Sequence, residues 1–295
     1  MNAPLDEIAA IGQAGDPLDE IAAIGQASDP LDKALRAHAL VGKLAEWSGE
    51  ASRLRREAIE ALIGQRMPQA EIAEHLRISR VRVGQLLRSG PSPERALLSA
   101  DGGPVTVALG SKQAQVGDGT PNDMISRDAA DAYDTLRTAL DHWGVICSRE
   151  IVPAPGMIDL NRDRLIVLGS PKVLPMVGQI MASDPHLVFD ADAHSRFLVE
   201  RATGAQHRSP QDRGEPADYA YVGRLPRPDG RGHFLWLAGI HAAGTHGAAR
   251  YLVDNAPDLY RSAKDKLFSL VIAATYEPAT RTITSTSALT KTFIR

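Results

Sequence analysis

Residues 69–88 read QAEIAEHLRISRVRVGQLLR, and the spacing of their apolar side chains decides the fold of the first part of the chain. The pattern fits two short helices that cross over a shared core, and it does not fit one continuous helix. Ser79 follows a turn and is expected to cap the second helix, because its hydroxyl can accept a hydrogen bond from an amide two or three residues later. The apolar positions are Ile72, Ala73, Leu76, Ile78, Val83 and Leu86.

The outward face of the second helix is rich in arginine. Four arginines occur between Arg77 and Arg88, with no acidic residue among them. Arginine and glutamine make paired hydrogen bonds to guanine and adenine edges in a major groove, so Arg80, Arg82 and Gln85 are predicted to meet base edges. Arg77 and Arg88 are predicted to meet phosphates. The predicted DNA-binding residues are Arg77, Ser79, Arg80, Arg82, Gln85 and Arg88.

This stretch resembles the helix-turn-helix of sigma-70 region 4, and more closely the sigma-like transcriptional regulators of actinobacteria. The resemblance rests on the apolar positions above, on Gln69, and on a preceding helix that ends at residues 66–68. It covers roughly a quarter of the chain. Arg77 departs from the pattern, because glycine usually stands there to permit a left-handed turn. The resemblance implies a module that reads double-stranded DNA.

Two other interpretations of the same stretch stay open. In one, the helical hairpin only packs on the rest of the protein. In the other, the helix-turn-helix binds a protein, and the chain is an interaction scaffold. A face that carries only arginine favours nucleic acid, since packing alone gives such a face no purpose.

The composition excludes several classes of protein. With 295 residues the chain is long enough for two domains, and its net charge of -3 means that any DNA affinity comes from a local patch. The single cysteine, Cys147, excludes an intrachain disulfide framework and a zinc site built on several thiolates, which suits a reducing cytoplasm. No run of about 18 apolar residues and no secretory signal occurs. We expect a soluble, cytoplasmic protein without a membrane partner.

The chain begins with a repeat. PLDEIAAIGQAGD from Pro4 is followed at once by PLDEIAAIGQASD from Pro17, and a third copy from Pro30 diverges. Aspartate and proline suit a helix start, whereas the glycine of each copy stops propagation, so short helices are expected. Residues 1–29 are interpreted as an acidic arm. A tolerated duplication without function is favoured over a partner contact or a mimic of DNA.

Residues 32–65 have periodic apolar side chains, which predict one long helix or two in tandem with a joint near Gly49. The later part carries Arg53 and Arg56 as further phosphate contacts. The earlier part, with Trp47, has more apolar surface than a small module needs. This surface is either the seam of a homodimer or a face that packs on the C-terminal domain. A homodimer is expected, because bacterial operators are commonly two-fold symmetric.

Beyond the helix-turn-helix module, assigned to residues 30–95, the pattern changes. Glycine and proline at residues 90–93 end the module, and a connector with little structure is expected to lead to Val105. Strand patterns then alternate with helical patterns, which predicts an all-α module followed by a mixed-sheet, Rossmann-like α/β domain at residues 103–295.

The expected strands of this domain are residues 105–109, 144–152, 164–170, 186–190, 196–201, 220–225, 234–239 and 268–276. The expected helices are residues 129–143, 173–182 and 248–255. Turn signals predict hairpins at residues 202–204 and 229–230, and a polar, glycine-rich composition predicts a surface loop at residues 110–123.

Two strand-to-helix junctions carry the predicted ligand site. At the first, Gly169 and Ser170 follow a buried strand, and Lys172 stands near the start of a helix. Free amides at a helix start attract anions, so a crevice at the carboxyl edge of the sheet is predicted to bind a small anionic ligand, such as a nucleotide. The second junction contributes Gly239, His241, Gly244, Thr245 and Gly247. A purely structural role for the glycines is favoured, and no cofactor is assigned.

An enzyme is the competing class. Ser170 does not belong to a Gly-x-Ser-x-Gly elbow, and His241 and His246 lie five apart across a turn, which argues against a metal site. A nucleotide hydrolase or transferase would use His241, Thr245 and Lys172. We instead expect a sequence-specific transcription regulator whose C-terminal domain senses a ligand or mediates assembly.

Overall fold

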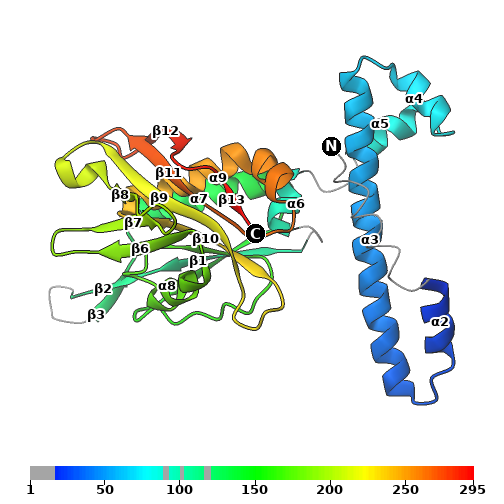
Figure 1. Ribbon diagram of the computed structural model, residues 1–295, viewed down its shortest axis with the longest axis horizontal. Coiled ribbons are helices and arrows are strands. Elements are labelled where there is room, and N and C mark those ends of the chain that lie inside the picture. The colour runs from blue at the N-terminus through cyan, green and yellow to red at the C-terminus, as the bar shows by residue number, and fades with distance from the viewer. Residues whose placement is uncertain (1–16, 89–92, 100–102, 116–120) are drawn as a thin grey trace. The chain divides into compact units, whose positions relative to one another are not determined.

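In Figure 1, the computed structural model describes residues 17–88, 93–99, 103–115 and 121–295. The chain separates into two compact units, residues 1–90 and residues 91–295. The first copy of the repeat, which starts at Pro4, lies outside the described residues.

The first unit is helical throughout its described residues. Its elements are α2 (Pro17–Gly25), α3 (Pro30–Gly64), α4 (Gln69–His75) and α5 (Arg80–Arg88). α3 is one continuous helix with no joint at Gly49, so the alternative of two tandem helices is wrong. Asp29 caps α3 by accepting hydrogen bonds from two amides of its first turn. α2 packs along the first part of α3, where Lys43 pairs with Glu20 at 3.1 Å.

A small core joins α3, α4 and α5. Its buried side chains are Ile59, Ile72, Ala73, Val83 and Leu86. Arg77 has a φ of 53° and forms the left-handed turn between α4 and α5. Ser79 Oγ accepts a hydrogen bond from the Arg82 amide at 3.1 Å, which confirms the predicted cap. The prediction that Leu76 joins this core is wrong, because Leu76 ends α4 and is 42% exposed.

The second unit is built on a mixed eight-stranded sheet. Its strands are β1 (Val105–Gly110), β4 (Cys147–Val152), β5 (Leu165–Leu168), β9 (Ala217–Pro226), β10 (His233–Gly239), β11 (Phe268–Tyr276), β12 (Ile283–Ala288) and β13 (Phe293–Ile294). They lie in the order β12-β11-β9-β10-β5-β1-β4, with β13 paired to β11. β4, β1, β5 and β10 are parallel, and the others pair antiparallel with their neighbours. The α/β prediction is confirmed at this level.

Both faces of the sheet are covered (Figure 1). One face packs against α6 (Pro93–Ser99), α7 (Arg127–His142) and α9 (Ala242–Ala263). The other face packs against α8 (Pro175–Ile180) and a small sheet of β6 (Leu187–Ala191), β7 (Arg196–Glu200) and β8 (Gln206–Arg208). Burial on both faces explains why β5 reads as an unbroken apolar run, LIVL. Two short 3₁₀ helices span Met181–Ser183 and Pro210–Arg213.

α6 belongs to the second unit, so the expectation of a connector with little structure is wrong for residues 93–99. The Arg224 side chain on β9 is 1% exposed, and its guanidinium donates to the carbonyl oxygens of Leu97, Lys264 and Lys266. Burial lowers the pKa of Arg224 to about 10. Because a buried cation needs acceptors, this arginine joins α6 to the turn after α9.

Residues 110–123 also differ from the expected surface loop. Lys112–Gln115 (β2) and Pro121–Met124 (β3) pair as antiparallel strands. Their polar sequences lack the apolar alternation by which strands are recognised, which explains the error. The hairpins predicted at residues 202–204 and 229–230 are confirmed, since they join β7 to β8 and β9 to β10.

Candidate functional sites

α5 presents one face to the core of its unit and the other to solvent. Val83 and Leu86 are 0% and 4% exposed and hold α5 against α3 and α4. Arg80, Arg82 and Gln85 lie on the exposed face. The helix therefore carries a row of long polar side chains on a rigid, capped support.

The arginines of this surface are not neutralised by acids within the described part of the chain. Arg82 donates to Gln85 Oε1 at 3.1 Å, and neither Arg77 nor Arg80 pairs with a described carboxylate. Arg77 is exposed in the turn, beside the cap residue of α5. Arg88 belongs to α5, although its side chain is not among the described ones. The surface can therefore offer guanidinium donors to a phosphate or a base edge.

Arg56 behaves differently from the arginines of α5. It is 7% exposed and pairs with Glu60 at 3.2 Å on the same helix. A buried, paired guanidinium cannot reach a phosphate, so the phosphate contact expected for Arg56 is wrong. Arg53 lies in α3, outside the described side chains.

The two predicted ligand junctions lie at one edge of the sheet. β5 and β10 are parallel neighbours, with Leu168 level with Leu237, so the residues that follow them emerge at the same carboxyl edge. Gly169 donates its amide to the Leu237 carbonyl at 3.2 Å, and Gly239 ends β10 beside it. The structure therefore brings the two glycine junctions together.

A buried carboxylate occupies the start of α9. Asp218 on β9 is 0% exposed, and its Oδ2 accepts hydrogen bonds from the amides of His241 at 2.9 Å and Gly244 at 2.7 Å. Its Oδ1 accepts from the Ser209 hydroxyl at 2.6 Å and the Tyr219 amide at 2.8 Å. Burial raises the pKa of Asp218, and its hydrogen bonds act in the opposite direction. The amides of His241 and Gly244, which the sequence predicts to be free to bind an anion, are thus hydrogen-bonded to Asp218 instead.

The glycines of the second junction allow the chain to approach itself closely. A Cβ at Gly244 would lie 2.5 Å from the buried carboxylate, and one at Gly247 would overlap Ala274 on β11. A Cβ at Gly239 would overlap the backbone of Thr245, whose hydroxyl accepts the Gly239 amide at 2.9 Å. These glycines therefore serve internal packing, the role favoured for them from sequence.

The first junction is also filled from within. α8 begins with Pro175, which has no amide hydrogen, and the amides of Val173 and Leu174 donate to the Ser170 carbonyl at 2.9 and 3.0 Å. The Leu174 side chain is fully buried over the ends of β1 and β5. Lys172 is exposed beside this turn. The backbone amides on which the predicted anion site was based are therefore already hydrogen-bonded at this junction, and only side chains are left to bind an anion.

One side-chain pair stands at this edge. His241 Nε2 lies 2.7 Å from Asp212 Oδ1, and the two side chains are 34% and 28% exposed. A carboxylate that holds an imidazole in this way fixes the orientation of the ring. The pair therefore presents an oriented imidazole at the surface. Among the described residues, no group of three His, Cys, Asp or Glu is placed to hold a metal ion.

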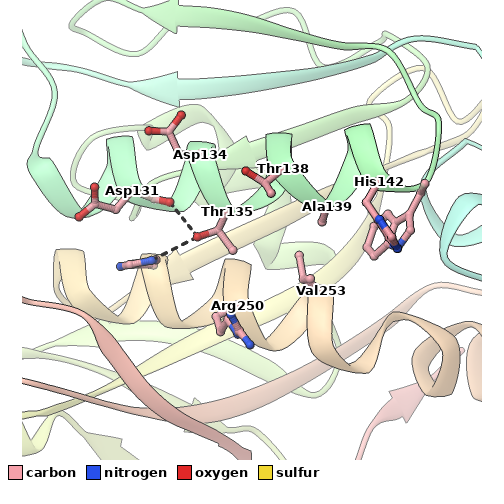
Figure 2. A pocket seen from close by; sticks show the side chains of 10 residues that line it. Asp131, Asp134, Thr135, Thr138, Ala139, His142, Arg250 and Val253 are labelled. Carbon is pink, nitrogen blue, oxygen red and sulfur yellow. Dashed lines mark hydrogen bonds between the residues drawn. The ribbon is translucent and has the colours of Figure 1, made fainter.

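A groove with a volume of about 650 Å³ lies elsewhere, along α7 and α9 (Figure 2). Asp131 and Asp134 line its α7 side, and Arg250 lines its α9 side. His246 is 9% exposed, its Nε2 lies 3.3 Å from Thr135 Oγ1, and burial lowers its pKa. The Thr135 hydroxyl instead donates to the Asp131 carbonyl, so the histidine does not activate it. None of the predicted ligand-binding residues lines this groove.

Comparison of the chain with models of known protein families, with curated proteins and with solved structures gave no match. Within the described residues, no helix combines the length and the apolar character that a bilayer span requires.

Proposed function

We propose that this chain is a cytoplasmic transcription regulator that binds specific sequences of double-stranded DNA through α5. The observation that carries the proposal is the two-sided character of this helix. Val83 and Leu86 are buried in the core that α4 shares with α3, while Arg80, Arg82 and Gln85 are exposed. This arrangement supports insertion of α5 into a major groove.

The proposed contacts fall into two groups. Arg80, Arg82 and Gln85 read base edges, because their side chains form paired hydrogen bonds with guanine and adenine. Arg77 and Arg88 meet phosphates, which fixes the register of the module without reading sequence. The resemblance to sigma-70 region 4 supports the same docking mode.

The test is a gel-shift series with the flank of the chain's own gene. The intact protein should bind one fragment, with an affinity that falls steeply with salt because phosphate contacts release counterions. Arg80→Ala should lose about 1–3 kcal/mol on the specific fragment and little on random DNA. Arg36→Ala is the matched control, since Arg36 is exposed on the same unit but pairs with Asp32 away from α5.

For the second unit we propose a Rossmann-like domain that senses a small anionic ligand, such as a nucleotide, or mediates assembly. The parallel strands lie in the order β4-β1-β5-β10, so the chain proceeds from β1 to β4 in one direction and from β5 to β10 in the other. Rossmann-like folds bind ligands at the carboxyl ends of the two strands between which the direction changes, here β1 and β5. Lys172 supplies positive charge for the ligand, and the His241 imidazole supplies a hydrogen-bonding group. Calorimetric titration with ATP and with inorganic phosphate tests this role, and Lys172→Ala should abolish any heat of binding.

The His241–Asp212 pair favours a second candidate, a nucleotide hydrolase or transferase. An imidazole oriented by a carboxylate is the usual form of a general base. Incubation of the intact protein with ATP tests this candidate. Turnover that disappears in His241→Ala and persists in Arg80→Ala would favour the enzyme.

A further inference from the structure

The middle of α3 carries an apolar stripe. Leu44, Trp47, Ala51 and Leu54 are spaced by three, four and three residues, which places them on one face of the helix. Leu44 is 37% exposed, Trp47 38% and Leu54 51%. Contiguous exposed apolar side chains of this kind are a feature of contact surfaces.

The contacts of α3 with the other described residues of its unit stop at both ends of this stripe. On the N-terminal side α2 packs along α3, and Ile24 and Leu40 are buried there. On the C-terminal side Ile59 enters the core of the helix-turn-helix. The stripe itself, from Leu44 to Leu54, is about 15 Å long. Such a length suits two helices that cross, whose contact is confined to a few turns.

We propose that a second copy of this chain covers the stripe, so that two α3 helices cross in an antiparallel, two-fold symmetric dimer. The antiparallel arrangement puts the large Trp47 against the partner's Ala51 and puts Leu44 against the partner's Leu54. Each layer then has a similar volume. A parallel pair would instead oppose two tryptophans in one layer and two alanines in another, which packs poorly.

The apolar patch is small compared with the roughly 800 Å² per partner of a typical stable interface, so we expect a dissociation constant of about micromolar.

The dimer also positions the two DNA-binding modules, and this part rests on the proposed function. Ile59 points about a quarter turn away from the stripe, so both modules lie on the same side of the antiparallel pair. Ile59 is about 15 Å along the axis from the centre of the stripe, which separates the two modules by about 30 Å. This separation is close to one turn of DNA, roughly 34–36 Å.

Sedimentation equilibrium of the full chain without DNA tests the pairing. The protein should dimerise, and Leu54→Glu should weaken dimerisation at least about tenfold, because a carboxylate would be buried against the partner's Leu44. Leu35→Glu is the matched control, since Leu35 is an equally apolar residue of α3, 62% exposed and off the stripe. Circular dichroism confirms that both variants stay helical.

Disulfide formation tests the orientation, in a Cys147→Ser background. A mixture of Leu44→Cys and Leu54→Cys chains should form a mixed disulfide dimer, whereas Leu44→Cys alone should not. A self-disulfide of Leu44→Cys would show a parallel pair and overturn the proposed orientation. A monomeric protein at about 100 micromolar, or equal dimerisation of Leu54→Glu and the wild type, would overturn the interface. Loss of DNA binding with an intact dimer would contradict only the proposed function.

Discussion

Replacement of Asp218 should destabilise the second unit strongly. Its carboxylate is fully buried and accepts the backbone amides of Tyr219, His241 and Gly244. Asp218→Ala leaves these three amides without their acceptor. A buried, unsatisfied donor costs about 1–3 kcal/mol, and water entering the cavity offsets part of that loss. The expected decrease in the free energy of unfolding is therefore roughly 3–5 kcal/mol.

Asp218→Asn should be much milder. With its oxygen towards His241 and Gly244, the asparagine keeps both of those bonds, and its NH2 group can donate to Ser209 Oγ, while the Tyr219 amide and the Ser209 hydroxyl hydrogen lose their acceptor. The expected loss is about 1–2 kcal/mol. Urea unfolding followed by tryptophan fluorescence measures both variants. If Asp218→Ala unfolds within 1 kcal/mol of the wild type, or if the asparagine variant is equally unstable, this account of the carboxylate is refuted.

Two further predictions concern backbone space and pH. Gly247→Ala should destabilise the protein by about 1–3 kcal/mol, because the new Cβ overlaps Ala274. Gly49→Ala, a site with open space around it, should instead stabilise α3 by about 0.5–1 kcal/mol. Thermal unfolding should therefore show a lower melting temperature for the first variant and a higher one for the second. Burial, and then the nearby charges of Arg224 and Arg227, lower the pKa of His233 from 6.5 to about 4. As the pH falls, His233 therefore takes up a proton in the unfolded chain before it does so in the folded chain, and the free energy of unfolding should fall by up to about 2 kcal/mol between about pH 7 and about pH 5. His233→Gln should reduce this loss. If the pH profile of that variant is the same as that of the wild type, His233 is not the cause.

The sequence predicts those elements whose determinants are local. The turn at Arg77 and the cap at Ser79 involve neighbouring residues, and both are found. The strands of the large sheet that bury apolar runs are found as well. β2, β3 and β12 are not recognisable from the sequence, because their residues are polar and their strand structure depends on pairing with a neighbour. α6 is not predictable locally, because the residues that it contacts, in α9 and at Arg224, are distant in the sequence.

The predicted ligand site shows the limit of the same reasoning. The spacing of glycines at a strand end indicates a close approach, but it does not reveal what approaches. At Gly244 the approaching group is Asp218, which is 26 residues earlier in the sequence. No local pattern around Asp218 distinguishes it from a surface acid at a strand start. The exposed arginines of α5 were predictable because the apolar spacing of their own helix determines their face.

The most direct measurement is the affinity of the intact protein for its own gene flank and for random DNA of the same length. The proposed function predicts tighter binding to the flank, and it predicts that Arg80→Ala removes most of this difference while Arg36→Ala preserves it. Equal affinity for both fragments, or an Arg80→Ala variant that discriminates as well as the wild type, would contradict the assignment of α5 as a reading helix.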